Sequence, residues 1–154
     1  MAHFSFSSKQ KIVNGVVTAI QYTTMTLFIV LTPKVAVGIG WQLVELGGIV
    51  LALWAVAIMR GKSKISIAPL PRQEAQLLTS GPYKIIRHPM YTSPFVMFVP
   101  LLVTHFDWFR AALLAVLYGN MIVKLLFEES VLREYFDGYE EYMKKTWRLF
   151  PFVF

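Results

Sequence analysis

The sequence predicts an all-α integral membrane protein with about four transmembrane helices, a cytosolic loop and a C-terminal interfacial helix. Its 154 residues are 56% hydrophobic and only 16% charged, with a mean hydropathy of +0.53. A typical soluble domain has about 25% charged residues. The apolar residues also form long stretches, which are separated by loops rich in Lys and Arg. Because a bilayer core offers no water to backbone groups, these stretches are expected to cross it as helices.

Three stretches have the length of about 20 apolar residues that a transmembrane helix needs. They cover residues 12–31, 38–59 and 108–127. A fourth apolar stretch, 91–106, is shorter and contains Pro94 and Pro100. At 1.5 Å per residue it reaches only about 24 Å, so we expect it to be kinked and packed against its neighbours. Asp107 and Trp108 leave almost no room for a loop, so the last two spans are predicted to form a tight antiparallel hairpin.

The distribution of positive charge predicts the orientation in the membrane. The segment 60–91 contains six Lys and Arg residues against one acidic residue, and further basic residues precede the first span and follow the last. The opposite face has only Lys34 and Arg110, and Arg110 can snorkel outward. By the positive-inside rule, both termini and the 60–91 loop face the cytosol. Four spans fit this arrangement, whereas three would not.

We expect residues 1–154 to form a single membrane domain. Its parts are an N-terminal helix pair (1–59), a cytosolic loop (60–91), a helix hairpin (91–127) and a cytosolic or interfacial tail (128–154). In the tail, hydrophobic residues recur at helical spacing between charges, and aromatic residues then cluster around Pro151. This pattern is typical of an interfacial helix and an aromatic anchor that lie on the membrane rather than in it.

Composition excludes several kinds of site. The chain has no Cys, and its three His residues are scattered, so thiolate chemistry, Cys-ligated metals and a multi-His iron centre are excluded. We expect no metal site. The net charge of +6 lies on an apolar chain, where basic loops indicate cytosolic faces and anionic lipid rather than nucleic acid.

Three polar residues line one face of the last span. Asn120, Lys124 and Glu128 are spaced by four, so they lie one above another on a helix. Charged groups near the hydrocarbon are costly and usually face a cavity or one another. They therefore form either part of a ligand site or an ion pair of Lys124 with Glu128, with Asn120 bonded to a neighbouring helix. Glu129 lies about 100° around the helix and can instead pair with Arg133 at i+4.

Prolines predict the local structure of the basic loop. Pro82 fits the first position of a short helix, with Ser80 or Gly81 as its cap. Pro89 is expected to end that turn, and Ser93-Pro94 to begin the next helix. Backbone N–H groups near helix N-termini are a natural seat for a carboxylate.

The side chains of this loop suit a zwitterionic ligand that contains a flat ring. Tyr83 and Tyr91 can stack on a ring or shield a cation, and His88 can donate or accept hydrogen bonds. Glu128 can bind an ammonium group. S-adenosylmethionine fits these side chains, because it has a flat adenine ring, a carboxylate and an ammonium group. The alternative is a proline-rich re-entry loop with interfacial tyrosines and phosphate-binding arginines.

Four segments occur in the order and at the spacing of one known family. They are Leu78-Thr79-Ser80-Gly81-Pro82-Tyr83, Arg87-His88-Pro89-Met90-Tyr91, Glu128-Glu129-Ser130-Val131-Leu132 and Tyr135-Phe136-Asp137-Gly138-Tyr139-Glu140-Glu141-Tyr142. Over residues 75–152 the chain thereby resembles the isoprenylcysteine carboxyl methyltransferase family of integral-membrane methyltransferases. The resemblance is specific for the combination of segments and does not extend to the first two spans.

The resemblance implies S-adenosylmethionine as the cofactor, bound by the loop and the tail without a Rossmann fold. The sequence accordingly has no GxGxxG. The cofactor contacts of the family carry over onto Gln76, Leu77, Leu78, Tyr83, His88, Pro89, Met90, Tyr91 and Glu128. Lys124 stands where characterised members have an arginine that serves the acceptor, so the charge is kept but the bidentate fork is lost. Asp137-Gly138 also departs from the usual Phe-Gly.

The expected function is S-adenosylmethionine-dependent methyl transfer to a lipophilic acceptor at the cytosolic membrane face. The acceptor is an isoprenylcysteine-like carboxylate, a phospholipid amine or another lipophilic molecule that enters from the bilayer between the last two spans. Lys124 and Glu128 are the expected catalytic residues. Glu128 fixes the cofactor ammonium, and Lys124 orients an anionic acceptor or acts as a base for a neutral one.

Two other functions remain open from the sequence. Sterol reductases, which use NADPH, resemble the His-Pro and tyrosine-rich segments but are much longer. A four-helix transporter or scaffold would use Glu45 or Lys124 as its coupling charge. The expected partners are membrane lipids and the acceptor. Gly47, Gly48 and Ala52 suit either packing within the fold or a homodimer. A bacterial or archaeal plasma membrane is the expected location, with the endoplasmic reticulum as the alternative.

Overall fold

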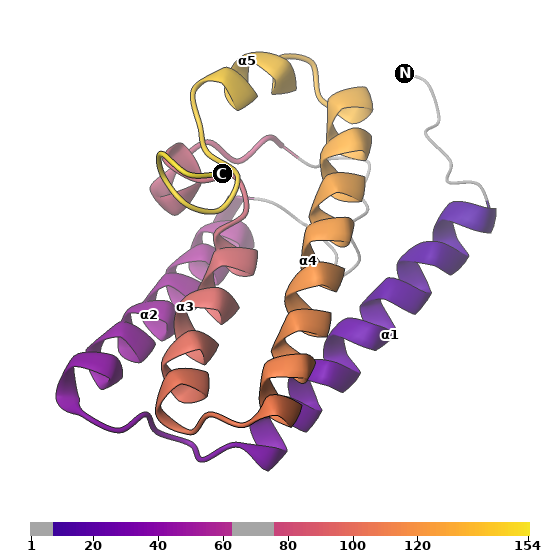
Figure 1. The fold of residues 1–154 in the computed structure, drawn as a ribbon. Helices are drawn as coiled ribbons and strands as arrows, with labels where there is room; N and C mark the ends of the chain where they lie inside the picture. The colour runs from indigo at the N-terminus through magenta and orange to yellow at the C-terminus, as the bar shows by residue number, and fades with distance from the viewer. Residues whose placement is uncertain (1–7, 63–75) are drawn as a thin grey trace.

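The computed structural model describes residues 8–62 and 76–154, and this part of the chain is helical (Figure 1). The helices are α1 (Ser8–Leu31), α2 (Ile39–Lys62), the 3₁₀ helix η1 (Gly81–Lys84), α3 (Pro89–Thr104), α4 (Trp108–Tyr135) and α5 (Tyr139–Lys144). The described residues contain no strand, only a single bridge between Ile86 and Trp147. The predicted all-α fold class is therefore confirmed.

The four long helices alternate in direction between two ends of the molecule (Figure 1). The α1–α2 and α3–α4 connections lie at one end, whereas η1, α5 and the C-terminus lie at the other. By length and composition, α1, α2 and α4 can cross a membrane. Helix α3 is the shorter apolar helix that the sequence predicted, with Pro94 and Pro100 inside it.

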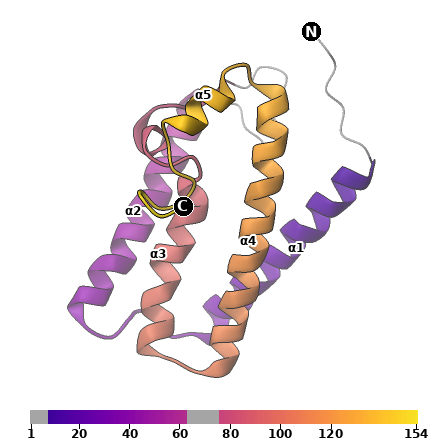
Figure 2. The same ribbon diagram turned by 45° about the horizontal axis from the view of Figure 1, so that its top comes forward.

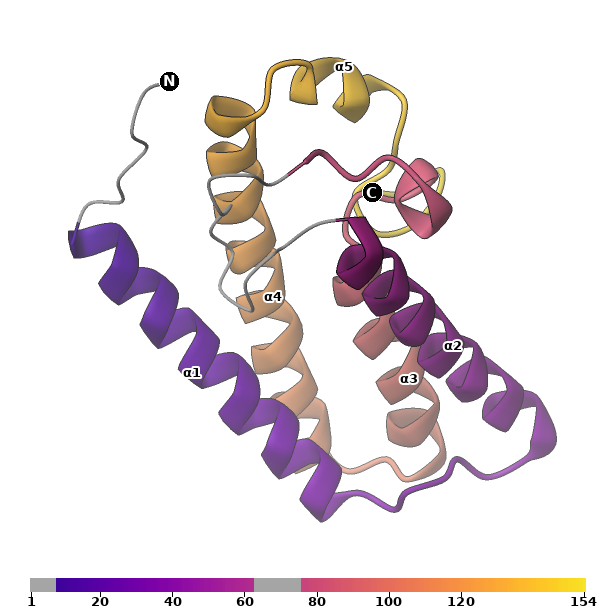
Figure 3. The same ribbon diagram turned by 180° about the vertical axis from the view of Figure 1, so that it is seen from behind.

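Helix α3 packs mainly against α2, and α4 packs mainly against α1, as the views from above and behind show (Figures 2 and 3). The tight α3–α4 connection is confirmed, because only residues 105–107 join the two helices. The two helices nevertheless contact each other less than they contact α2 and α1. They meet near their connection, where Leu101 and Leu117 belong to one buried cluster with Phe28 of α1.

Gly48 explains the close approach of α2 and α3. A Cβ atom at this position would lie 2.9 Å from the backbone nitrogen of Met97 and 3.0 Å from the carbonyl oxygen of Ser93. A Cβ atom at the neighbouring Gly47 would have nothing within 4 Å. Gly48 therefore serves the packing of this fold, which was one of the two roles that the sequence left open.

Arg110 ties together the connections at the end away from η1. Instead of extending outward, its guanidinium donates from Nη2 to the carbonyl of Leu31 at 2.9 Å and from Nη1 to that of His105 at 2.8 Å. Asp107 caps α4 by accepting from the Arg110 backbone N–H at 2.8 Å. Carbonyls at the ends of α1 and α3 are thereby satisfied, as helix ends require.

The predicted start of the third long helix is wrong. Helix α3 begins at Pro89 with His88 as its N-cap residue, so Ser93-Pro94 lies inside the helix rather than at its start. The pyrrolidine ring presets a helical φ at the first position of a helix, which is why Pro89 begins α3 as well as ending the preceding turn. Pro82 does lie in the first turn of η1, as predicted, with Ser80 at the N-cap.

The tail also differs from the prediction of one interfacial helix. Helix α4 continues past residue 128 to Tyr135, and α5 has only six residues. Val131, Tyr139 and Tyr142 are buried, because they pack against the rest of the protein. The helical spacing of these residues thus reflects inward packing around a turn at Gly138, whose φ of 83° suits glycine.

Candidate functional site

Helix α4 is longer than a membrane span needs, and two adjacent glutamates lie near its end. At 1.5 Å per residue, Trp108 to Glu128 spans about 30 Å, which equals the typical thickness of the hydrocarbon core. The last turns of α4, from Glu129 to Tyr135, exceed that length. Lys124 lies one turn before Glu128.

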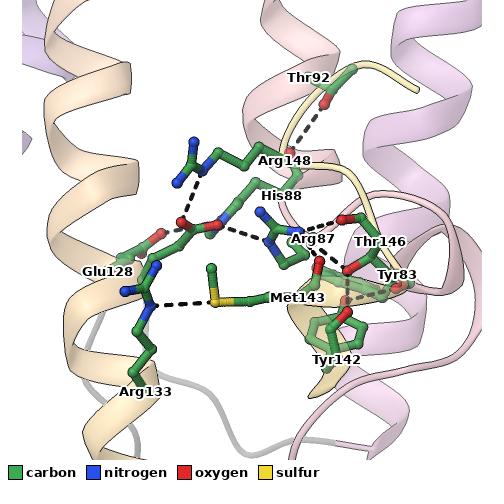
Figure 4. A network of polar contacts seen from close by, with 11 residues as sticks. Tyr83, Arg87, His88, Thr92, Glu128, Arg133, Tyr142, Met143, Thr146 and Arg148 are labelled. Atoms are coloured by element: carbon green, nitrogen blue, oxygen red, sulfur yellow. Dashed lines mark hydrogen bonds and ion pairs between the residues drawn. The ribbon is translucent and has the colours of Figure 1, made fainter. Parts of the chain in front are cut away.

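Glu129 is the centre of a buried ionic network. Its partners Arg87, His88 and Arg148 are labelled in Figure 4. Its side chain is 2% exposed and accepts from Arg87 Nε at 2.8 Å and from Arg148 Nε at 2.9 Å. Nε2 of His88 is 3.4 Å from its Oε1 atom. The predicted pair with Arg133 is wrong, because Arg133 donates to the sulfur of Met143 instead. A buried carboxylate needs several charged partners, and Arg87 and Arg148, which are distant in sequence, supply them.

Arg87 links this network to the C-terminal segment. Its Nη1 donates to the carbonyls of Met143, at 3.1 Å, and of Thr146. The backbone N–H groups of Arg87 and His88 donate to Trp147 O at 2.7 Å and Arg148 O at 3.1 Å. The C-terminal segment thus runs beside residues 85–88 and is fixed there by both main-chain and side-chain bonds.

The same segment also covers the start of α3. Thr92 donates from its hydroxyl to Leu149 O at 2.9 Å. The ring of Phe150 packs edge-on against Phe95, with the centroids 5.9 Å apart. Tyr142 of α5 donates its hydroxyl to the carbonyl of Tyr83 at 2.6 Å. Chain segments from η1, α3, α4 and α5 are therefore held together at one end of the molecule.

Glu128 lies beside the aromatic residues of the loop. Its side chain is 17% exposed, and Oε2 is 3.7 Å from Nδ1 of the buried His88. Tyr91 forms a side-chain hydrogen bond with Glu128, and its ring meets the His88 ring edge-on at 5.7 Å. The structure thus brings His88, Tyr91 and Glu128 together, as the site prediction requires.

Tyr83 contributes a neutral phenol to this end of the molecule. Burial, with the negative charge of Glu128, raises the pKa of Tyr83 to about 12. The phenol therefore keeps its proton and can donate a hydrogen bond. Within the described part of the chain, its buried hydroxyl has no hydrogen-bond partner.

The remaining predicted cofactor residues differ in exposure. Leu78 and Tyr83 are buried together against Ala55 of α2. Pro89 is fully buried at the start of α3. Leu77 is half-buried, and both Gln76 and Met90 are exposed. The buried positions therefore have a packing role whether or not they contact a ligand.

Lys124 faces α1 rather than Glu128. It is 6% exposed, and its Nζ donates to Oε1 of Gln21 at 2.9 Å. Asn120 donates to the carbonyl of Val17 at 2.9 Å, which is the bond to a neighbouring helix that one of the two alternatives predicted. Among the described residues, Lys124 makes no ion pair with Glu128, so the structural alternative of a Lys124–Glu128 pair is not observed.

Sequence reasoning missed several residues of this end of the molecule. They are Gln21, Arg87, Tyr142, Thr146 and Arg148. Arg87 carried a signal, since it begins the Arg-His-Pro segment. No sequence pattern indicated the other four residues, because their partners are distant in the chain. The partners of Gln21, Tyr142 and Thr146 lie 59 or more residues away, and that of Arg148 lies 19 residues away across α5.

Comparison with known proteins identifies the family. Residues 36–138, about two thirds of the chain, match the model of the phospholipid methyltransferase family. The nickel-cobalt-cadmium resistance protein NccN of Alcaligenes xylosoxydans xylosoxydans is 32% identical over 81 residues. That match covers 52% of this chain but only 38% of NccN. No solved structure matches. The chain is therefore a membrane protein that belongs to the phospholipid methyltransferase family.

Proposed function

We propose that this protein transfers a methyl group from S-adenosylmethionine to a lipophilic acceptor at the end of the molecule that bears Glu128. The family supports methyl transfer. The observation that carries the proposal is the cluster of Glu128, His88 and Tyr91 at the expected boundary of the hydrocarbon core. A carboxylate in this position can bind a water-borne cation while remaining close to lipid-phase molecules.

The residues present fit S-adenosylmethionine. Glu128 offers a carboxylate for an ammonium group, and Tyr91 and His88 offer ring faces and edges. The buried hydroxyl of Tyr83, which has no partner in the described part of the protein, can bind a polar atom of the ligand. Such orphaned polar atoms are uncommon in native proteins and call for a reason. When bound, S-adenosylmethionine supplies a methyl group on a positively charged sulfur, which is already activated for transfer.

The protein's own contribution is alignment and the exclusion of water. The C-terminal segment covers the start of α3 and is fixed by Arg87, Thr92 and Arg148. Such a cover separates the reacting groups from bulk water. Arg87 and Thr92 are buried, Arg148 is partly buried, and each is bonded, so the cover is a fixed part of the site.

Lys124 is the proposed acceptor-orienting residue. It is buried one turn below Glu128, and its ammonium is held by the neutral amide of Gln21. A fixed positive charge attracts an anion and repels an ammonium group. The acceptor that suits this position is therefore a lipophilic carboxylate, of the kind that the isoprenylcysteine methyltransferase resemblance implies, rather than a phospholipid amine.

The orientation belongs to the same proposal. The end with Glu128 bears Lys84, Lys144, Lys145 and other basic residues, whereas the opposite end has Lys34 and Arg110. The positive-inside rule places the basic end in the cytosol, where S-adenosylmethionine is made. A bacterial or archaeal plasma membrane is the proposed location.

The proposal is tested by ligand-dependent stability of the detergent-purified protein. S-adenosylhomocysteine should raise the free energy of unfolding, by about 2.7 kcal/mol at a concentration of 100 times its Kd. The increase should disappear in Glu128→Gln and persist in Glu134→Gln, which changes an exposed glutamate of the same helix. Stabilisation by NADPH instead would point to a reductase. No stabilisation of a folded wild-type protein by S-adenosylhomocysteine would refute the proposal.

A further inference from the structure

The C-terminal loop, residues 147–154, exposes a compact group of large apolar side chains. Phe152 is 86% exposed and Val153 is 79% exposed. Trp147 is 40% exposed, and its ring lies 5.4 Å from that of Phe152. Ile85, which is 53% exposed, is joined to the loop through the bond from Trp147 N to Ile85 O. In water, a contiguous apolar surface of this kind would be unfavourable, so it indicates a contact with something apolar.

The loop is a folded turn rather than a loose end. The backbone N–H groups of Leu149 and Phe150 both donate to Phe154 O, at 2.8 and 3.1 Å. Phe152 has a φ of 67°, a conformation that bulky residues rarely adopt. The guanidinium of Arg148 lies over the Phe154 ring at 4.9 Å. The fold thus holds Phe152 and Val153 outward at the tip of a fixed turn.

The residues to which the loop is attached determine its level along the apolar helices. Leu149 and Phe150 are attached to Thr92 and Phe95, which lie in the first two turns of α3. Figures 1 and 2 show the loop beside the upper turns of α3 and α2. Helix α2 exposes Leu53 and Trp54. The apolar tip of the loop is therefore next to surfaces that face lipid, at the level where α3 begins.

The charges around the loop match a membrane surface. Lys84, Lys144 and Lys145 are all exposed near it. Lysines that flank a patch of Trp and Phe are typical of segments that bury aromatic side chains in the interface of a bilayer with anionic lipid. A second protein copy would match the apolar tip but not this basic rim, because the same positive face would meet itself.

We propose that the C-terminal loop inserts Phe152 and Val153 into the bilayer interface beside α3, with Trp147 at the headgroup level. The loop therefore acts as a lipid anchor for the segment that covers residues 87–92. This anchor does not depend on the identity of the reaction, and it can be tested without any activity measurement.

Spin labelling tests the proposal, because the chain has no native Cys. Phe152→Cys and Val153→Cys would each carry one nitroxide label in vesicles of phosphatidylcholine and phosphatidylglycerol. Collision rates with oxygen, which concentrates in lipid, and with a water-soluble nickel chelate would then be measured. Leu53→Cys, on the exposed face of α2, is the lipid control, and Glu140→Cys, on exposed α5, is the water control. Each labelled protein must unfold at the temperature of the unlabelled chain.

We expect the labels at 152 and 153 to behave like the label at 53, with oxygen collisions exceeding nickel collisions. Labels that behave like the one at 140 would show that the loop lies in water and would overturn the proposal. Labels shielded from both reagents, with dipolar broadening between labels, would show that a second copy covers the loop and would overturn it as well.

Discussion

Replacement of Glu129 tests the ionic network that holds the candidate site together. This carboxylate is 2% exposed and bonds to Arg87 and Arg148. In Glu129→Ala, Arg87 would keep its bonds to the carbonyl of Met143 and to the carbonyl and hydroxyl of Thr146, and would remain 8% exposed. A buried cation would thereby lose its counter-charge.

The expected loss of unfolding free energy is about 3–5 kcal/mol, the usual cost of removing one partner from a buried ion pair. Arg148 adds little to this figure, because its side chain is 29% exposed and can reach water. Glu129→Gln should lose less unfolding free energy, because the amide keeps one acceptor oxygen and removes only the contribution of the negative charge to the bond. Against a total stability of about 5–15 kcal/mol, both changes are readily measurable.

The assay is denaturant-induced unfolding in detergent micelles, followed by circular dichroism. Arg133→Ala is the matched control, because Arg133 is one turn from Glu129 on the same helix but exposed and not bonded to it. It should stay within about 0.5 kcal/mol of the wild type. The reasoning would be refuted if Glu129→Ala cost no more than Arg133→Ala, or if Arg133→Ala were the more costly change.

Three further predictions use the same purified protein. Gly48→Ala should lose about 1–3 kcal/mol of unfolding free energy, because the added methyl group would overpack against α3. Gly47→Ala has open space around it and should leave the unfolding free energy unchanged or raise it by up to about 1 kcal/mol. Equal effects of the two substitutions would contradict the close contact of α2 and α3. Tyr142→Phe should lower the unfolding free energy by about 1 kcal/mol, because it removes the hydroxyl that donates to Tyr83 O. An unchanged unfolding free energy would contradict that bond. Lys124→Met should abolish methyl transfer while stabilisation by S-adenosylhomocysteine is retained, and normal turnover would exclude its acceptor role.

The sequence predicted those parts of the fold that depend on local composition. Apolar length alone located α1, α2 and α4, and the brevity of α3 followed from the same pattern. The role of Pro82 in η1 was also predictable, because proline acts on its immediate neighbours. The start of α3 was placed five residues late, since Pro89 can end one turn and begin the next helix with the same φ.

The parts that could not be predicted depend on contacts between distant residues. The partner of Glu129 was expected on its own helix, where Arg133 has the correct spacing. In the folded chain, Arg87 and Arg148 reach the same carboxylate from outside α4 and bury it. Likewise, the helical spacing in the tail matched either a surface helix or an inward-facing turn. Contacts with distant residues, such as the bond of Tyr142 to Tyr83, distinguish the two.

The central claim is that Glu128 belongs to a methyl-transfer site that serves a lipid-phase acceptor. The most direct measurement uses membranes of cells that produce the protein, incubated with S-adenosylmethionine carrying a tritium-labelled methyl group. The account predicts label in the solvent-extracted lipid fraction for the wild type and Glu134→Gln, and none above background for Glu128→Gln. Wild-type membranes that transfer no label above membranes lacking the protein, or full transfer by Glu128→Gln, would contradict it.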